Sequence, residues 1–304
     1  MTDHAGPVVP VRARGAYRQS ALVLGTAQLG GAYGIANRTG MPDDDATARM
    51  LATARDLGVT HLDTARAYGD SERRIGAALG DLGLAVVTKI APGGDVRESV
   101  QASRAALRVT GPLTILLHRA ADAPAGWADL RGCLETGEAD RVGVSVQSPD
   151  ELRRVLELPG LGYVQLPCNI LDRRWLAGDL SDALAERPDL VVTVRSAYLQ
   201  GLLAAGSAVT WPHLPDDRRD AVVSTLDRLA AGLGRADRAD LCLAYLLSLP
   251  WVTSLVVGAE TEEQLRQNAA LVSRKPLTED ERERVLSELP EMPVDLLDPS
   301  RWSA

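Results

Sequence analysis

The sequence is poor in cysteine. Its 304 residues include only Cys133, Cys168 and Cys242, which are scattered and odd in number. No Cys-x-x-Cys pair or Cys/His cluster is present, so a disulfide framework and a structural zinc site are both unexpected. Cysteine used in this way is typical of a reducing compartment, and we expect the protein in the cytoplasm.

Long apolar runs are also missing. No stretch approaches the roughly 20 consecutive apolar residues that a membrane helix needs, and residues 1–20 lack the apolar core of a signal peptide. The net charge is −8 and no basic block offsets it, which argues against nonspecific nucleic-acid binding. We therefore expect a soluble protein with a small-molecule partner and no membrane or nucleic-acid partner.

The sequence instead alternates short apolar runs with longer amphipathic stretches. Eight runs are rich in Leu, Ile and Val, as expected for parallel strands that are buried on both faces. They cover residues 22–27, 59–65, 84–90, 113–118, 141–146, 163–167, 190–196 and 252–258. No G-x-G-x-x-G follows the first run, so a Rossmann nucleotide site has no support. Eight βα repeats in a chain of this length predict a single (β/α)8 TIM barrel.

The amphipathic stretches predict the helices. Ser148 is a typical N-cap, because Pro149 follows it at the first helical position and Glu151 lies three residues on. The predicted helices cover residues 43–57, 71–79, 95–108, 127–137, 149–157, 177–186, 217–232, 236–249, 262–272 and 278–289. Because no linker interrupts them, we expect one domain over residues 1–304, with an N-terminal extension at 1–20 and a C-terminal helix and tail at 273–304.

Polar residues recur at the C-terminal ends of the predicted strands, where the reactive groups of a barrel lie. Taken singly, each has a structural explanation, such as a hydrogen-bonded His or a packed Tyr. Charged groups are nevertheless costly in such places unless they are paired or functional. The strand ends carry Asp63, Lys89, His118, Ser145, Gln165 and Arg195, and Tyr68 lies in the loop after Asp63.

Four of these side chains suit proton transfer to a carbonyl oxygen. A phenol with a pKa of about 10 is a weak acid, but a nearby ammonium stabilises its anion and a carboxylate keeps that ammonium charged. Asp63, Lys89 and Tyr68 would form such a relay. His118 would then donate a hydrogen bond to the substrate oxygen. The set contains no metal-ligand pattern and no Ser–His or Cys–His nucleophile.

These residues resemble the signature of the aldo-keto reductase family. The resemblance is carried by D-T-A-x-x-Y-G-x-S-E at 63–72, V-V-T-K-I at 86–90 and L-L-H at 116–118, and it runs from G-T-A-Q-L-G at 25–30 to V-V-G-A-E-T-E-E-Q-L-R-Q-N at 256–268. The segments G-T-A-Q-L-G-x-x-Y-G-I-A-N (25–37) and R-S-A-Y-L-Q-G-L-L (195–203) are similar to a bacterial subgroup often found among sugar and secondary-metabolite genes.

The resemblance implies an enzyme with a catalytic tetrad of Asp63, Tyr68, Lys89 and His118. It would reduce an aldehyde or ketone, such as a keto-sugar or a secondary-metabolite carbonyl, with NAD(P)H, and Tyr68 would protonate the oxygen. An intact His118 favours carbonyl chemistry over reduction of a carbon–carbon double bond. Two alternatives stay open: a sugar isomerase or epimerase that uses bound cofactor without net redox change, and a cofactor-binding regulatory protein with little turnover.

The resemblance also implies where the cofactor binds, with NADPH ranked ahead of NADH. The Asn that usually follows Ser145 is Val146 here, so Gln147 or Asn169 could supply the missing amide contact. Arg195 falls where an aromatic ring is common, and it would stack on the nicotinamide, bind a cofactor phosphate or cap the strand. The implied cofactor-binding residues are Thr26, Asp63, Ser145, Gln165, Arg195, Ser196, Leu199, Gly201, Gly258, Glu260, Gln264 and Asn268.

Two of these residues bear on the choice of cofactor. Gln264 and Glu260 stand where basic residues that bind phosphate are common. A carboxylate repels a 2′-phosphate, whereas it accepts a hydrogen bond from a free ribose 2′-hydroxyl.

Loops after the strands are expected to shape the substrate pocket. Arg119, Arg173 and Arg174 would suit an anionic substrate such as a phosphorylated or nucleotide sugar, unless they are solvated or salt-bridged on this acidic protein. The substrate candidates are Tyr33, Arg119, Arg173 and Trp175, with Asn37, Arg174, Tyr198 and Trp211 in the same loops.

Overall fold

Eight parallel strands form the centre of the protein. The computed structural model describes residues 8–302 apart from 38, 91–94 and 177. The strands close into a barrel in the order β10-β3-β4-β5-β6-β7-β8-β9. They are β3 (Leu22–Gly25), β4 (His61–Asp63), β5 (Ala85–Ile90), β6 (Leu113–Leu117), β7 (Ala139–Ser145), β8 (Tyr163–Pro167), β9 (Val191–Arg195) and β10 (Ser254–Gly258). Each overlaps one of the eight predicted runs, and the predicted (β/α)8 barrel is confirmed.

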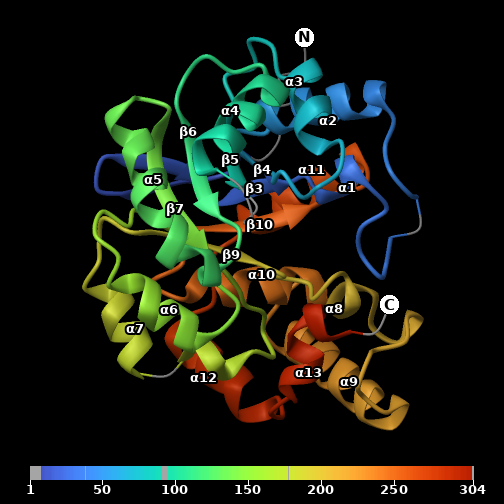
Figure 1. The fold of residues 1–304 in the computed structure, drawn as a ribbon. Helices are drawn as coiled ribbons and strands as arrows, with labels where there is room; N and C mark the ends of the chain where they lie inside the picture. The colour runs from blue at the N-terminus through green and yellow to red at the C-terminus, as the bar shows by residue number, and fades with distance from the viewer. Residues whose placement is uncertain (1–7, 38, 91–94, 177, 303–304) are drawn as a thin grey trace.

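Helices surround the barrel and connect its strands (Figure 1). Their bounds are α1 (Ala27–Gly30), α2 (Asp44–Asp56), α3 (Ser71–Ala78), α4 (Val96–Leu107), α5 (Ala123–Glu135), α6 (Pro149–Leu156), α7 (Gly178–Ala185), α8 (Leu202–Ala205), α9 (Asp216–Gly232), α10 (Arg238–Ser248), α11 (Glu262–Val272), α12 (Glu279–Glu288) and α13 (Val294–Leu297). Ser148 caps α6 as predicted, because its Oγ accepts a hydrogen bond from the Glu151 amide at 3.3 Å. No helix in the described ranges is long and apolar enough to cross a membrane.

A hairpin that the sequence pattern did not indicate covers the N-terminal end of the barrel. It consists of β1 (Val11–Arg14) and β2 (Tyr17–Ser20), which pair antiparallel. The Tyr17 hydroxyl lies 2.8 Å from Nε2 of His61, the first residue of β4. Gln19 Nε2 donates to the hydroxyl of Tyr163, the first residue of β8, at 3.2 Å. With this end covered, the strand ends at the opposite rim are left to form a site.

Candidate active site

A cavity of about 800 Å³ opens at the C-terminal ends of the strands. Such a volume accommodates a cofactor-sized ligand. Its lining runs from the ends of β4, β5 and β6 to the exposed face of α11. The predicted residues that line it are Thr26, Tyr33, Asn37, Asp63, Tyr68, Lys89, His118, Ser145, Gln165, Arg195, Ser196, Tyr198, Gly201, Gly258, Glu260, Gln264 and Asn268.

Asp63 and Lys89 form a buried ion pair at the floor of this cavity. The distance between Lys89 Nζ and Asp63 Oδ1 is 2.6 Å, and the two side chains are 1% and 4% exposed. Lys89 also donates to the Thr64 carbonyl at 2.9 Å. Adjacent strands bring the pair together, since β4 and β5 are neighbours in the barrel. Each charge therefore has its partner in a place where an unpaired charge would be costly.

Tyr68 and His118 complete the predicted group of four. The Lys89 ammonium lies 5.0 Å from the centre of the Tyr68 ring. The rings of Tyr68 and His118 meet edge to face, with centres 5.9 Å apart. The structure thus brings the carboxylate, ammonium, phenol and imidazole into one cavity, as the order of the motifs suggested.

A close backbone contact holds the loop that carries Tyr68. A Cβ on Gly30 would lie 1.7 Å from the Tyr68 carbonyl oxygen, so only glycine allows α1 to approach this closely. The Ser71 amide donates to the same carbonyl at 3.0 Å. The Ser71 hydroxyl donates to the Thr26 carbonyl at 2.9 Å. Gly30 and Ser71 were missing from the predicted site, although both lie in the motifs that carry the resemblance.

The protonation states of Lys89 and His118 differ because their neighbours differ. Burial disfavours the Lys89 ammonium, but its ion pair and hydrogen bond with the Asp63 carboxylate outweigh that cost, so the pKa of Lys89 is raised. Burial lowers the pKa of His118 to about 4, and nearby cations act in the same direction. At neutral pH the lysine is therefore charged and the imidazole neutral, which leaves one imidazole N–H as a donor.

Gln165 offers a contact for an amide-bearing ligand. Its Nε2 donates to Asp63 Oδ2 at 2.7 Å, while its Oε1 is buried and has no partner among the described residues. A buried acceptor without a donor is costly. The carboxamide of a nicotinamide carries the N–H groups that would satisfy it, and Ser145 lines the cavity beside it. The residues present therefore fit a nicotinamide cofactor at this position.

The segment after β9 is held in an unusual backbone conformation at the cavity wall. Ser196, Leu199 and Gln200 have φ values of 63°, 49° and 52°, in the region that side chains rarely adopt. Leu199 is fully buried and does not line the cavity, unlike Ser196 and Gly201. Leu199 therefore could not contact the cofactor directly, as predicted, and would act only by supporting the turn at the cavity wall.

The far end of the cavity is polar and contains no described cation. Tyr198 donates its hydroxyl proton to Asn268 Oδ1 at 2.9 Å. Gln264 Oε1 accepts from the Glu260 amide at 2.7 Å, and Glu260 Oε2 accepts from the Thr39 hydroxyl at 2.9 Å. The cations that line the cavity within the described part of the chain are Lys89 and Arg195, and both lie at strand ends.

Most of the predicted substrate residues lie outside the cavity. Tyr33 lines it, whereas Arg119 is exposed at the end of β6 and does not. Arg173 donates to the carbonyls of Leu286 and Leu289 at the end of α12. Trp175 is 1% exposed. The expectation that Arg173 and Trp175 meet a ligand in this cavity therefore does not match their positions.

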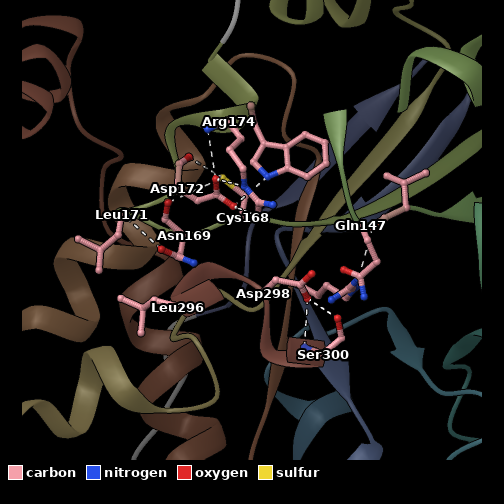
Figure 2. A network of polar contacts seen from close by, with 12 residues as sticks. Gln147, Cys168, Asn169, Leu171, Asp172, Arg174, Leu296, Asp298 and Ser300 are labelled. Atoms are coloured by element: carbon pink, nitrogen blue, oxygen red, sulfur yellow. Dashed lines mark hydrogen bonds and ion pairs between the residues drawn. The ribbon is translucent and has the colours of Figure 1, made fainter. Parts of the chain in front are cut away.

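Asp172 holds Arg174 and Trp175, neither of which lines the cavity, and Figure 2 shows the contact between Asp172 and Arg174. Its buried carboxylate accepts from Arg174 Nη2 at 2.7 Å and from Trp175 Nε1 at 3.1 Å. Asn169 is buried as well, and its Oδ1 accepts from the Leu171 amide at 3.0 Å. These residues stabilise the loop after β8, and Asn169 does not line the cavity as a substitute amide would. Gln147, the other candidate, does line it.

The C-terminal segment supplies two lining residues that the sequence did not suggest. Pro299 and Ser300 line the cavity. Asp298 accepts from the Ser300 amide at 3.1 Å and from its hydroxyl at 2.6 Å (Figure 2). Nothing in their local pattern marks them, because their place depends on how the chain after α13 returns to the barrel.

The described residues contain no group of three His, Cys, Asp or Glu side chains arranged to hold a metal ion.

Comparisons with known proteins agree with this architecture. Aldo-keto reductase AKR11C1 from Bacillus halodurans, in its holo form, superposes with a TM-score of 0.78 at 21% identity, covering 93% of this chain and 97% of that one. Glycerol dehydrogenase AKR11B4 from Gluconobacter oxydans gives 0.75 at 22% identity, covering 96% and 98%. No curated protein matches the chain in sequence. The model of the Aldo/keto reductase family matches residues 21–287. The chain therefore belongs to the aldo/keto reductase family.

Proposed function

We propose that this protein reduces an aldehyde or ketone to an alcohol with NAD(P)H, and that Tyr68 donates the proton. The observation that carries the proposal is that Asp63, Tyr68, Lys89 and His118 line one cavity. The same cavity is lined by Gln165, whose buried Oε1 has no hydrogen-bond partner among the described residues. Family membership supports the same class of reaction.

Each side chain has a distinct task in this proposal. A nicotinamide cofactor, held by Ser145 and Gln165, would supply the hydride that the carbonyl carbon needs. His118, neutral at neutral pH, donates a hydrogen bond that orients the carbonyl oxygen and polarises it. Tyr68 gives its hydroxyl proton to that oxygen as the alcohol forms. The Lys89 ammonium stabilises the phenolate left behind, and Asp63 keeps that ammonium in place.

The preference between NADPH and NADH is argued from the charges near α11. The family resemblance favours NADPH. The described cations of the cavity lie at its catalytic end, however, and Glu260 lies at the opposite end. A carboxylate repels a 2′-phosphate but accepts a hydrogen bond from a 2′-hydroxyl. We therefore expect NADH to bind at least as tightly as NADPH, and a tenfold tighter NADPH complex would overturn this ranking.

The test combines cofactor titration with turnover. NADH and NADPH are titrated by fluorescence, and a carbonyl panel that includes keto-sugars is then assayed for stoichiometric cofactor oxidation. Stoichiometric oxidation separates reduction from an isomerisation without net redox change. Tyr68→Phe should lower kcat by about 10²- to 10⁴-fold while the cofactor Kd stays unchanged. Turnover of Tyr68→Phe at the wild-type rate would refute the assignment of the proton donor.

A further inference from the structure

Arg195 places a positive charge in the cavity without a carboxylate partner. It is the last residue of β9, and its Nη2 donates to Gln147 Oε1 at 2.7 Å and to the Val146 carbonyl at 3.3 Å. No carboxylate oxygen in the described part of the chain forms an ion pair with it. Lys89, the other cation of the described lining, is paired with Asp63. Of the two described cations at this end of the cavity, Arg195 is therefore the one without a carboxylate in an ion pair.

The remaining donors of Arg195 are available to a ligand. Its Nε and Nη1 have no protein partner among the described residues and are not enclosed by protein, so they are open to the cavity. Gln147 also lines the cavity, and because its oxygen accepts from Arg195, its amide N–H groups are left to donate as well. Two adjacent side chains therefore present only donors to the same space.

The surroundings do not neutralise this charge. The carboxylates that act on Arg195 are Asp63 and Asp298, but Asp63 is paired with Lys89, and Asp298 accepts from the Ser300 amide and hydroxyl and lies 3.4 Å from Arg301 Nε. Partial burial lowers the pKa of Arg195, although a guanidinium stays protonated in proteins. A guanidinium that is partly desolvated and lacks a counter-ion gains most from an anionic ligand.

We propose that Arg195, with the Gln147 amide beside it, binds an oxyanion group on the carbonyl substrate, so that the natural substrates are aldehydes or ketones that also carry a carboxylate or a phosphate. The inference rests on the proposed carbonyl reduction and names its substrate class. It replaces the expected stacking of Arg195 on the nicotinamide, and it moves anion recognition from Arg173 and Arg174, which do not line the cavity, to Arg195, which does.

The test uses pairs of substrates that differ in charge. The carboxylate pair is 4-carboxybenzaldehyde and its methyl ester, and the phosphate pair is glyceraldehyde 3-phosphate and glyceraldehyde. The wild-type protein should favour the anionic member of at least one pair by about tenfold or more in kcat/KM, as expected for a charge-assisted hydrogen bond. The pair that shows the preference identifies the anionic group.

Two variants then separate direct contact from other effects. Arg195→Gln should reduce the anionic preference to about one, because kcat/KM falls much more for the anionic member than for the neutral one, while the Kd for NADH and NADPH stays unchanged. Arg119→Gln removes a positive charge that also acts on His118 but does not line the cavity, so it should keep most of the preference. Arg195→Lys should restore part of it, because the charge returns without the guanidinium geometry.

Other outcomes would overturn the inference. A weaker cofactor Kd in Arg195→Gln, with the anionic preference intact, would assign Arg195 to the cofactor. An equal loss of preference in Arg119→Gln would indicate a long-range field rather than contact. A wild-type protein that reduces the neutral members as well as the anionic ones would refute the substrate class while leaving carbonyl reduction standing. Failure to reduce any member would refute both.

Discussion

Replacing His61 by Gln should make the protein more resistant to acid. His61 is 5% exposed at the N-terminal end of the barrel. Its Nε2 lies 2.8 Å from the Tyr17 hydroxyl and its Nδ1 lies 2.7 Å from the Thr60 hydroxyl. Hydroxyl groups satisfy a neutral imidazole in either tautomer, but they provide no counter-charge for an imidazolium.

The size of the effect follows from the pKa. Burial lowers the pKa of His61 to about 4 from its usual value of 6.5. Between these two values the unfolded chain binds a proton at His61 that the folded protein does not. His61 therefore lowers the stability progressively as the pH falls from 6.5 to 4, and its contribution is constant below that. The two states differ by roughly two and a half pKa units, which corresponds to about 3 kcal/mol.

The assay is the free energy of unfolding by denaturant, measured from pH 7.5 to pH 4. Over this range the wild-type protein should lose about 3 kcal/mol more of its free energy of unfolding than His61→Gln does. His213 is exposed, so His213→Gln is the matched control and should leave the pH dependence unchanged. If His61→Gln lost stability on acidification as steeply as the wild type, the imidazole would not be held neutral by burial and the reasoning would fail.

Two further substitutions test the site itself. Lys89→Met should lower the free energy of unfolding by about 3–5 kcal/mol, because it leaves the buried Asp63 carboxylate without its cation; a loss below about 1 kcal/mol in a denaturant titration would contradict this. Gly30→Ala should lower both kcat and Tm, because its Cβ would lie 1.7 Å from the Tyr68 carbonyl, whereas the control Gly31→Ala meets no atom within 4 Å. Equal behaviour of the two alanine variants would rule out that contact.

The barrel could be predicted because its signals are local. A strand buried on both faces needs a continuous apolar run, and each of the eight runs coincides with a strand. The ends of those runs also locate Asp63, Lys89 and His118, since all parallel strands of a barrel end at the same rim. For these residues the position in the sequence is enough to indicate the position in space.

The rest depends on contacts that the sequence does not display. In β1 the apolar residues Val11 and Ala13 are exposed, and the strand is held by long-range bonds instead. Arg12 Nη1 and Nη2 donate to the Val252 and Leu247 carbonyls, both at 3.1 Å. Contacts with distant parts of the chain also decide whether an arginine is available to a ligand. Arg173 lies in the loop after β8 and donates to carbonyls at the end of α12, outside the cavity, whereas Arg195 ends β9 and lines the cavity.

The same kind of environment produces opposite charge states in the two titratable groups beside Tyr68. Lys89 and His118 are both desolvated, which disfavours the charged form of each. Lys89 stays charged because Asp63 lies 2.6 Å away, whereas His118 faces the cations Lys89 and Arg195 and becomes neutral. Arg195 therefore matters to the proposed chemistry twice. Its unpaired charge attracts an anionic substrate, and the same charge helps to keep His118 in the neutral form that donates to the carbonyl oxygen.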